Sequence, residues 1–462
     1  MKKVRSFILI LCLLLGNVVF SAEVIILHTS DTHGRISPIE YNGVNYMGGF
    51  SKRLNIVQDV RKHNKNVLLL DSGDYFQGSI YYRIDQGKSI AKLLPDIKYD
   101  AIALGNHEFD NGIKVLKRNI KNSKTQFLSA NVHFKDRYLK KAVKPYIIKE
   151  FEGEKILIIG VTTSSLGNLS DTSYVSVTNP IDEINKIVKD VQYDRLIILS
   201  HCGLEEDRQI AKAIPNIDVI LGGHNHYFFQ LPERVGKVMI VQDGEFGVRI
   251  GEIKLNKNIK TYRYKNVTPS VGTDRLVDKK IEKIDEHTKN VTKEVIATSK
   301  IMLIGKQTTI ESSQTNLGKL VLISMAKAFP NFDAVLTNSG SIRINKDFKG
   351  DITYADVLEI LPFDNNVVLV EIQGKYLKEI LKNGRQNNRR YLQYYVKDKN
   401  IDDNKIYKVV TNSYVAEGKD GYTSFKHGKV VKKFPIIPTK LLINTLREFQ
   451  EITDKDLRLE NL

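Results

Sequence analysis

The chain has 462 residues, of which 42% are hydrophobic and 27% are charged, and its formal net charge is +17. This composition is typical of globular packing and argues against a disordered or fibrous chain, and the length allows about two to four domains. Cations are spread along the chain, which indicates a solvated basic surface that also favours anionic ligands.

The first 22 residues have the plan of a secretory signal peptide. Basic residues within the first five positions precede an apolar run over 7–20, and the small residues Ser21 and Ala22 follow it. We therefore expect an exported protein, periplasmic or secreted. The alternative is an uncleaved membrane anchor, but the apolar run is shorter than the about 20 residues that span a bilayer comfortably. Removal of this segment would leave Cys202 as the sole cysteine, so we expect no disulfide within the chain.

Between residue 23 and about residue 257, short apolar runs alternate with segments of helical spacing. The apolar runs predict strands over 24–28, 66–71, 100–105, 155–161, 195–201 and 218–224. The spacing of apolar residues between these runs predicts helices over 50–63, 113–120, 181–191 and 208–214. Alternation of this kind is typical of a layered α/β domain.

A charged segment over 273–299 predicts a solvated linker helix, because apolar residues such as Leu276, Ile281 and Ile284 recur on a charged background. It would separate a first domain over 23–272 from a second domain over 300–462. In the second part, apolar and β-branched runs predict strands over 333–340, 366–374 and 405–413, and helical spacing predicts helices over 316–329 and 374–382.

Several of the expected strands in the first domain end on a cluster of Asp, Asn and His. These clusters contain Asp31 and His33, Asp71 and Asp74, Asn106 and His107, His201, and His224 and His226. Any one of these histidines is more often a core or surface residue with an ordinary hydrogen bond. Because the carboxyl ends of parallel strands meet at one edge of a sheet, the recurrence favours a shared site.

The residue types in these clusters indicate metal chemistry. Carboxylate, imidazole and amide groups together suit divalent ions such as Zn, Mn, Co or Fe(II), and a shared carboxylate suits two ions. Two such ions would activate a bridging hydroxide and neutralise charge that develops on a phosphoryl group, so the pattern predicts metal-assisted phosphoester hydrolysis. Within the loop over 104–112, Glu108 and Phe109 have no expected role beyond spacing and packing.

The motifs D-x-H, G-D, G-N-H-E-x-D, S-H-x-G and G-G-H-x-H occur in this order and resemble those of the calcineurin-like metallophosphoesterases. The segments over 315–320, 337–343, 352–368 and 410–422 resemble the C-terminal domain of bacterial 5′-nucleotidases and periplasmic UDP-sugar hydrolases. The resemblance implies an α/β fold with a four-layer α-β-β-α metallophosphoesterase sandwich, a linker helix, and a smaller α+β substrate-binding domain.

The resemblance also implies roles for residues of the first domain. One metal ion would be held by Asp31, His33, Asp74 and His226, and the other by Asp74, Asn106, His201 and His224. Asp74 would then bridge the two ions. His107 matches the histidine that stabilises the transition state or assists the leaving oxygen, and Asp110 matches the carboxylate that orients this histidine.

In the second domain, the resemblance implies a nucleotide site. Phe363 and Tyr414 match two aromatic residues that sandwich a nucleobase, and Asn365 and Asp420 match polar groups around the base and the ribose. Arg343 matches a phosphate-binding arginine, whose planar guanidinium suits phosphate oxygens. Without the resemblance, aromatic residues beside strands would more often belong to the core.

The sequence departs from the family pattern in two places. Glu311 stands where many relatives have an arginine, which reverses the charge expected beside the phosphate. Ser339 and Ser341 replace the first and third glycines of a common N-G-G-G-I-R run, where a side chain could crowd the site or add a hydroxyl donor. Lys306, Lys319, Arg389 or Arg390 could compensate for the missing arginine; alternatively, the preferred substrate is not a simple monophosphate.

The leading hypothesis is an exported two-metal phosphohydrolase that acts on nucleoside 5′-monophosphates, as a monomer and without a nucleic-acid partner. One alternative uses the same site on 2′,3′-cyclic nucleotides or UDP-sugars, and another is a nucleotide-binding surface or adhesion protein. The charge of +17 and the basic and aromatic run over 389–395 motivate a third alternative, single-stranded nucleic-acid binding. A strand with charged flanks explains that run equally well.

Overall fold

The computed structural model describes residues 23–166, 174–256, 260–344, 346–363, 365–385, 391–434 and 437–461. The predicted signal segment over 1–22 lies outside these residues, as do Arg389 and Arg390. The chain divides into two compact units, unit 1 (Met1–Thr288) and unit 2 (Lys289–Leu462). Each unit is described by itself.

Within the described residues, two β-sheets form the centre of unit 1. The first sheet has, in spatial order, β17 (Lys260–Asn266), β16 (Arg249–Leu255), β1 (Val24–Thr29), β4 (Val67–Asp71), β5 (Ala101–Ala103), β6 (Phe127–Leu128) and β8 (Val143–Lys144). The second has β14 (Glu233–Val235), β15 (Val238–Gln242), β13 (Val219–Gly222), β12 (Arg195–His201), β10 (Glu154–Thr162) and β9 (Tyr146–Phe151). The strands β1, β4, β5 and β6 are mutually parallel, and so are β10, β12, β13 and β15.

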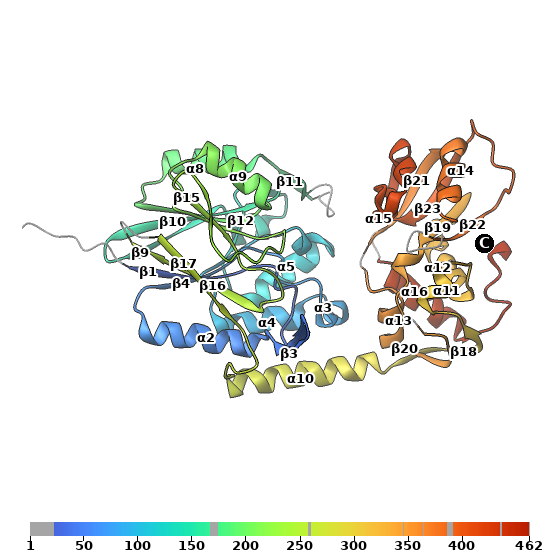
Figure 1. The fold of residues 1–462 in the computed structure, drawn as a ribbon, viewed down its shortest axis with the longest axis horizontal. Helices are drawn as coiled ribbons and strands as arrows, with labels where there is room; N and C mark the ends of the chain where they lie inside the picture. The colour runs from blue at the N-terminus through green and yellow to red at the C-terminus, as the bar shows by residue number, and fades with distance from the viewer. Residues whose placement is uncertain are drawn as a thin grey trace, which may run out of the picture. The chain divides into compact units, whose positions relative to one another are not determined.

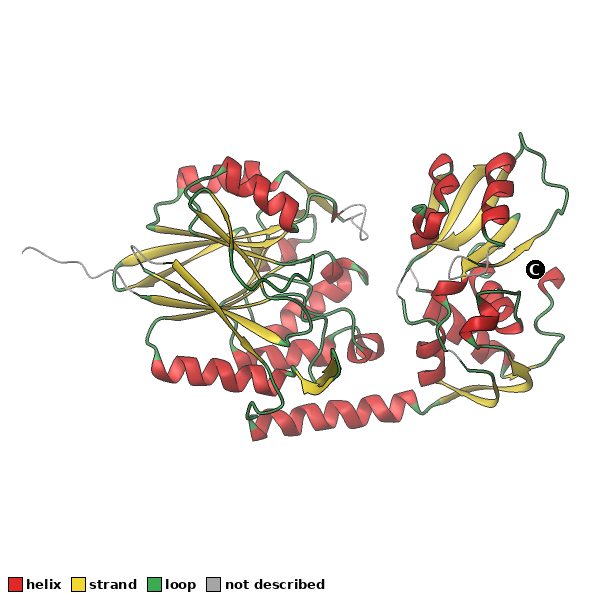
Figure 2. Cartoon of the chain, in the orientation of Figure 1, coloured by secondary structure: helices red, strands yellow, loops and turns green. Residues whose placement is uncertain are grey.

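Helices cover the outer faces of both sheets, so that unit 1 has four layers (Figure 1, Figure 2). Beside the first sheet lie α2 (Phe50–His63), α3 (Ile80–Asp85), α4 (Lys88–Ile97) and α5 (Gly112–Ser123), and beside the second lie α8 (Pro180–Asp190) and α9 (Leu204–Ala213). Shorter elements are β2 (Ile39–Tyr41), β3 (Val44–Met47), β7 (Val132–Phe134), α6 (Arg137–Ala142) and β11 (Val175–Val177). The predicted α-β-β-α sandwich is confirmed.

The core of unit 1 is divided by its layers. Ile26, Leu70, Ile158 and Leu199 belong to a buried cluster between the two sheets, and separate clusters lie beneath the helices on either outer face. Strands β1 and β12 are buried along their whole lengths. Since both faces of these strands are covered, polar side chains are accommodated at the strand ends, which is where the sequence has them.

The segment predicted as a linker helix is a helix over most of its length. Helix α10 (Arg275–Thr292) presents charged residues to solvent, but it ends before Ser299. The prediction was wrong for the last residues of the segment, because Val295 begins strand β18 (Val295–Leu303), which pairs antiparallel with β20 (Phe348–Thr353). The β-branched residues in this stretch suit a strand better than a helix.

Unit 2 combines two sheets with helices, as expected for an α+β domain. One sheet contains β20, β18 and β25 (Glu451–Ile452), and the other contains β22 (Leu392–Val396), β19 (Ala334–Asn338), β23 (Ile406–Asn412), β21 (Val367–Gln373) and β24 (Lys429–Lys433). The helices are α11 (Gln307–Ile310), α12 (Asn316–Ala326), α13 (Tyr354–Ile360), α14 (Gly374–Asn383), α15 (Ser413–Ala416) and α16 (Pro438–Phe449). The basic and aromatic run includes most of β22, which pairs with β19.

The two sheets of unit 1 are in close contact where Gly160 of β10 faces Leu128 of β6. A Cβ atom at Gly160 would lie within 2.3 Å of the Leu128 Cβ. We therefore expect Gly160→Ala to lower the free energy of unfolding by about 1–3 kcal/mol, as overpacking of a core does. Urea denaturation measures the effect, and Gly272→Ala is the matched control because its nearest neighbour would lie 3.7 Å away. Equal midpoints for the two variants would contradict the expectation.

Candidate functional site

The predicted metal-binding residues of unit 1 follow the carboxyl ends of parallel strands. Asp31 and His33 follow β1, Asp74 follows β4, Asn106 follows β5, His201 ends β12, and His224 and His226 follow β13. The imidazole rings of His33 and His107 lie 5.4 Å apart, and those of His201 and His224 lie 5.2 Å apart. The fold thus brings loops from both sheets to one place.

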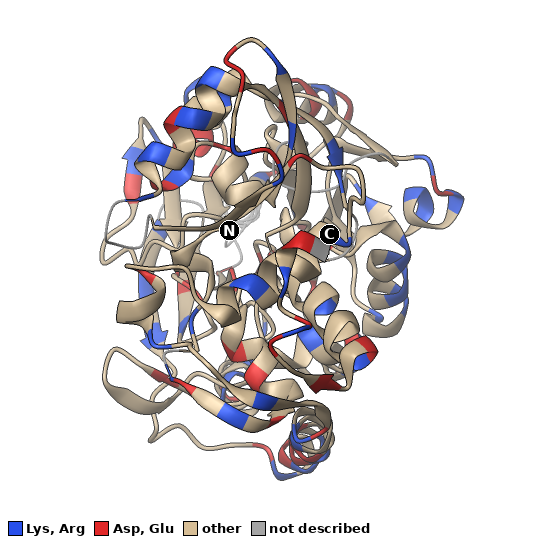
Figure 3. Cartoon of the chain, turned by 90° about the vertical axis from the view of Figure 1, so that its right-hand side faces the viewer, with Lys and Arg blue, Asp and Glu red and all other residues tan. Residues whose placement is uncertain are grey.

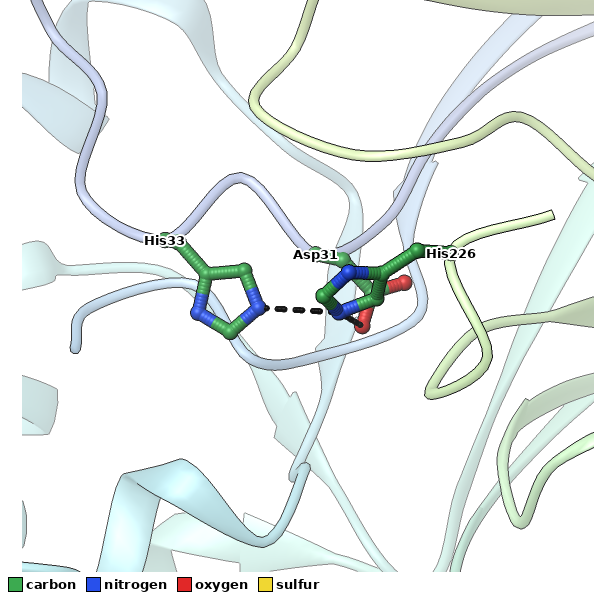
Figure 4. A group of neighbouring side chains, drawn as sticks. All are labelled: Asp31, His33 and His226. Atoms are coloured by element: carbon green, nitrogen blue, oxygen red, sulfur yellow. Dashed lines mark hydrogen bonds and ion pairs between the residues drawn. The ribbon is translucent and has the colours of Figure 1, made fainter. Parts of the chain in front are cut away.

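Asp31, His33 and His226 form the first group of candidate metal ligands. One ligand atom from each lies within 4.8 Å of the others. Figure 4 shows both imidazoles and the carboxylate facing one another. The Nε2 atoms of His33 and His226 are 3.1 Å apart, and His226 Nε2 is 3.5 Å from Asp31 Oδ1.

Asp74, His201 and His224 form the second group, again with one ligand atom each within 4.8 Å of the others. His201 Nε2 lies 3.1 Å from Asp74 Oδ2. The same carboxylate oxygen is 4.0 Å from His107 Nε2, and Asp74 Oδ1 accepts a hydrogen bond from the backbone N–H of His107 at 2.9 Å. A bridging role for Asp74 and a ligand role for Asn106 stay predictions.

Hydrogen bonds behind the imidazoles orient them toward the two groups. The Nδ1 atoms of His33, His201 and His226 lie 2.8, 2.7 and 2.6 Å from the Gln77 carbonyl, the Ser72 carbonyl and the Glu245 carboxylate, respectively. With Nδ1 donating to these acceptors, each Nε2 is available as a lone-pair donor. Carboxylate oxygens and imidazole nitrogens in this arrangement fit divalent metal ions.

The backbone of the two groups is strained. The residues with positive φ include Asp31 (49°), His33 (47°), Asp74 (54°), His224 (76°) and His226 (58°). A residue other than glycine costs on the order of 1–3 kcal/mol in such a conformation, which persists only where the surroundings hold it. The backbone N–H groups of Asp31 and His33 donate to the carbonyls of Gly73 and Asp74, at 2.9 and 3.0 Å, so adjacent loops hold one another.

Burial and neighbouring charges shift the pKa values of these residues. Burial raises the pKa of Asp31 to about 6 and lowers those of His33 and His224 to about 4. Both histidines are therefore neutral near pH 7. Burial opposes ionisation of Asp74, but His201 and His107 outweigh it and hold the pKa of Asp74 well below its usual range.

His107 and Asp110 form a hydrogen-bonded pair beside the second group. His107 Nδ1 lies 2.6 Å from Asp110 Oδ2, and the His107 side chain is 36% exposed. Burial lowers the pKa of His107, but the carboxylates of Asp74 and Asp110 outweigh burial and raise it to about 10. The His107 imidazole is therefore charged near pH 7 and partly exposed.

Glu108 has a larger role than the sequence indicated. Its buried carboxylate accepts hydrogen bonds from the backbone N–H groups of Asp74 (2.9 Å), Tyr75 (2.8 Å), Phe76 (3.3 Å) and Gly105 (2.7 Å). It thus joins the loop after β4 to the loop after β5. Burial raises the pKa of Glu108 to about 7, although backbone donors favour its charged form. Assigning it to spacing and packing was wrong, because backbone donors from a distant loop leave no mark in the sequence.

Glu245 was also missed. It lies in the turn between β15 and β16, and its carboxylate holds His226 Nδ1 and accepts a hydrogen bond from Tyr41 Oη at 3.3 Å. No motif at this position marks it. It becomes recognisable only when the fold places the turn beside the G-G-H-x-H loop.

In unit 2, the structure brings all the predicted substrate-binding residues around one pocket of about 240 Å³. Its lining is Asn338, Gly340, Ser341, Arg343, Phe363, Asn365, Tyr414 and Asp420. Phe363 and Tyr414 are 45% and 38% exposed, so they are not ordinary core residues. Arg343 Nε donates to the Gly340 carbonyl at 2.8 Å, with the guanidinium 5.7 Å from the centre of the Phe363 ring.

Hydrogen bonds fix the polar side of this pocket. Tyr414 Oη donates to Asp420 Oδ1 at 3.1 Å, and Asn338 Nδ2 donates to Asp420 Oδ2 at 2.8 Å. Asn412 Nδ2 in turn donates to Asn338 Oδ1 at 3.1 Å. Neither asparagine was among the predicted residues, although Asn338 lies within the T-N-S-G-S-I-R segment that carried the resemblance.

The departures from the family pattern have local explanations. Glu311 caps α11 and accepts a hydrogen bond from Gln307 Nε2 at 2.9 Å, and it does not line the pocket described above. Ser341 donates its hydroxyl to the Asn338 carbonyl at 2.7 Å and is almost fully buried. The serine side chain therefore faces the turn that carries it.

Comparison with known proteins assigns both units. A calcineurin-like phosphoesterase model matches residues 24–228, and a 5′-nucleotidase C-terminal domain model matches residues 295–396 and 390–427. The four-layer sandwich and the paired carboxylate–imidazole groups define unit 1 as a metallophosphoesterase. The chain thus combines a metallophosphoesterase domain with a 5′-nucleotidase-type C-terminal domain, and it is a metal-dependent phosphoester hydrolase.

Relatives extend over most of the chain. A 5′-nucleotidase of Diplobatis ommata is 28% identical, over 88% of this chain and 84% of that protein. The trifunctional nucleotide phosphoesterase protein YfkN of Bacillus subtilis is 26% identical over 88% of this chain, which spans 33% of YfkN. The crystal structure of a 5′-nucleotidase precursor from Thermus thermophilus is 27% identical with a TM-score of 0.66, and covers 94% of this chain and 97% of its own.

Replacement of Glu108 by glutamine should loosen the loop that carries Asp74. An amide has one acceptor oxygen, so at least one backbone N–H group would lose its partner, at a cost of about 1–3 kcal/mol in the free energy of unfolding. We also expect weaker retention of metal on dialysis, measured by elemental analysis. Glu205→Gln is the control, because the Glu205 side chain is 75% exposed. Wild-type stability and metal content in Glu108→Gln would refute the role.

Proposed function

We propose that the chain is an exported two-metal nucleotide phosphohydrolase that releases phosphate from nucleoside 5′-monophosphates. The proposal depends on one observation, that unit 1 carries two carboxylate–imidazole groups while unit 2 carries an open pocket with two exposed aromatic rings and an arginine. The first arrangement suits a phosphoryl group and the second suits a nucleoside. The proposed catalytic domain is 23–272, the proposed linker is 273–299, and the proposed nucleotide-recognition domain is 300–462.

Seven side chains of unit 1 are the proposed ligands of two divalent ions. They are Asp31, His33, Asp74, Asn106, His201, His224 and His226. When bound, such ions polarise a phosphoryl group and lower the pKa of coordinated water. Zn, Mn, Co and Fe all suit this mixed ligand set.

His107 is the proposed acid. Its Nε2 atom lies 4.0 Å from Asp74 Oδ2, and its Nδ1 atom lies 2.6 Å from Asp110 Oδ2. The ring therefore has a fixed orientation and a proton to donate. Protonation of the leaving 5′-oxygen by His107 would lower the cost of expelling the nucleoside. Asp74 and Asp110 together favour the charged form of the ring.

In unit 2, Phe363 and Tyr414 are the proposed partners of the base. Stacking of a base on an aromatic ring is worth about 1–3 kcal/mol and tolerates different bases. Asn365 and Asp420 are the proposed partners of the base and the ribose, and Arg343 is the proposed phosphate contact. Asp420 is already fixed by Tyr414 and Asn338, so the carboxylate is preorganised for a hydroxyl group.

A second candidate uses the same site on 2′,3′-cyclic nucleotides or UDP-sugars. Two observations favour testing it. Glu311 occupies an expected arginine position and does not line the unit 2 pocket, and a relative over 88% of this chain is named a trifunctional nucleotide phosphoesterase.

Export and a monomeric state complete the proposal. The pattern over 1–22 supports export. Among the described residues, no helix is both long and apolar enough to cross a bilayer. Acidic and basic residues are interspersed on the side drawn in Figure 3, so we assign the net charge of +17 to a mixed solvated surface rather than to a nucleic-acid site.

His107→Ala should reduce kcat by about 10²–10⁴-fold, because it removes the proposed general acid. Metal content should stay at the wild-type level, since His107 is not among the proposed ligands. Phosphate release from AMP and elemental analysis measure the two quantities. His63→Ala is the control, because His63 lies on α2 with a side chain that is 62% exposed. Unchanged turnover would remove His107 from the mechanism.

Chelation should abolish hydrolysis, and stepwise return of Mn²⁺ or Co²⁺ should restore it. With the restored protein, we expect phosphate release from AMP to have a higher kcat/KM than cleavage of 2′,3′-cyclic AMP or UDP-glucose. A reversed order would favour the second candidate. Nucleotide binding without turnover at any metal concentration would instead support a binding protein.

A further inference from the structure

His28 in β1 is a fully buried histidine whose two ring nitrogens both have side-chain partners. Its Nδ1 atom lies 2.6 Å from Asp243 Oδ2, and its Nε2 atom lies 2.8 Å from Ser72 Oγ. All three residues are buried, with exposed fractions of 0%, 2% and 0% for His28, Asp243 and Ser72. None of them belongs to the proposed ligands or to the proposed acid pair.

Ser72 and Asp243 each have a further hydrogen-bond partner that fixes them in place. Ser72 Oγ lies 2.7 Å from the Leu221 carbonyl and 2.8 Å from His28 Nε2, so its hydroxyl bridges the histidine and the backbone of β13. Tyr262 Oη donates to Asp243 Oδ1 at 2.7 Å, which leaves Oδ2 to accept from His28 Nδ1. The His28 ring thus joins Asp243 to Ser72 and locks the Ser72 side chain.

The same residue types occur in serine hydrolases, but this arrangement does not suit nucleophilic attack. Ser72 is fully buried, and its hydroxyl also contacts the Leu221 carbonyl. A substrate has no access to the hydroxyl. These hydrogen bonds therefore suit a structural role better than a catalytic one.

These hydrogen bonds hold the backbone that supports the second group, Asp74, His201 and His224. The Ser72 carbonyl orients His201 by accepting from its Nδ1 atom at 2.7 Å, and Ser72 lies two residues before Asp74. The first group depends on other acceptors, since His33 is oriented by the Gln77 carbonyl and His226 by the Glu245 carboxylate. Ser72 thus orients an imidazole of the second group directly, whereas it orients neither imidazole of the first group.

We propose that His28, paired with Asp243, is a positioning residue that fixes Ser72 and thereby tunes metal affinity at the Asp74–His201–His224 group selectively. The inference rests on the proposed two-metal function, but metal binding can be measured whether or not nucleotides are hydrolysed. A protein that binds two ions and hydrolyses no nucleotide would refute the proposed function and leave the positioning role open to the same measurement.

The experiment is a Co²⁺ titration of the full-length metal-free protein, followed by the visible absorption of the bound ions and by competition with a chelator. His33→Ala and His224→Ala provide reference spectra, because each removes a ligand of one group. We expect His28→Leu and Ser72→Ala to weaken Co²⁺ binding at the second group by about 10–100-fold, as loss of outer hydrogen bonds to ligands does. The first group should keep its affinity.

Two further variants separate positioning from general stability. His28→Gln keeps an amide donor near the Nε2 position, so it should retain more affinity at the second group than His28→Leu. Ile198→Val trims a buried side chain of β12 in the core beneath α8 and α9, and should lower stability without changing either Co²⁺ affinity. Folded Ser72→Ala and His28→Gln variants with wild-type affinity at both groups, or equal weakening at both, would overturn the proposal.

Discussion

The buried strands at the centre of unit 1 determine where its polar chemistry can lie. Strands β1 and β12 are covered on both faces, so a carboxylate or imidazole within them would need a partner inside the core. Chemistry is therefore concentrated at the carboxyl ends of the parallel strands, where successive loops supply one or two ligands each. Asp74 shows the result most clearly, because it contacts His201 and the His107 backbone while Glu108 holds its own N–H group.

Much of this arrangement could be predicted, because it follows from periodicity and from residue types at strand ends. The helix predicted over 50–63 coincides with α2, and six of the seven predicted ligands lie in the two groups. Contacts between distant loops could not be predicted. Glu108 acts on backbone groups more than 30 positions earlier, and His28 and Asp243 are 215 positions apart. Such partners carry no local signature, so only the folded chain identifies them.

In unit 2, the substrate-binding residues could be predicted from the family resemblance but not from the sequence pattern alone. Phe363 and Tyr414 would have been assigned to the core from their positions beside strands, yet both are substantially exposed at one pocket. The pocket combines three segments that lack a common period, and its polar side depends on Asn338 and Asn412 as well as on the predicted Asp420. The end of the linker helix was predicted wrongly, because pairing of β18 with β20 overrode a helical spacing.

The left-handed backbone at Asp31, His33, Asp74, His224 and His226 has a consequence for how the protein could change. Glycine adopts this conformation without a steric penalty, so at each of these positions the side chain that is proposed to bind metal is also the one that strains the main chain. Stability and activity are therefore in conflict at the same residues. A descendant released from the need for catalysis would relieve this strain by replacing a proposed ligand with glycine, but at Asp31 and Asp74 it would also lose the carboxylates that accept from the backbone N–H groups of His224 and His107.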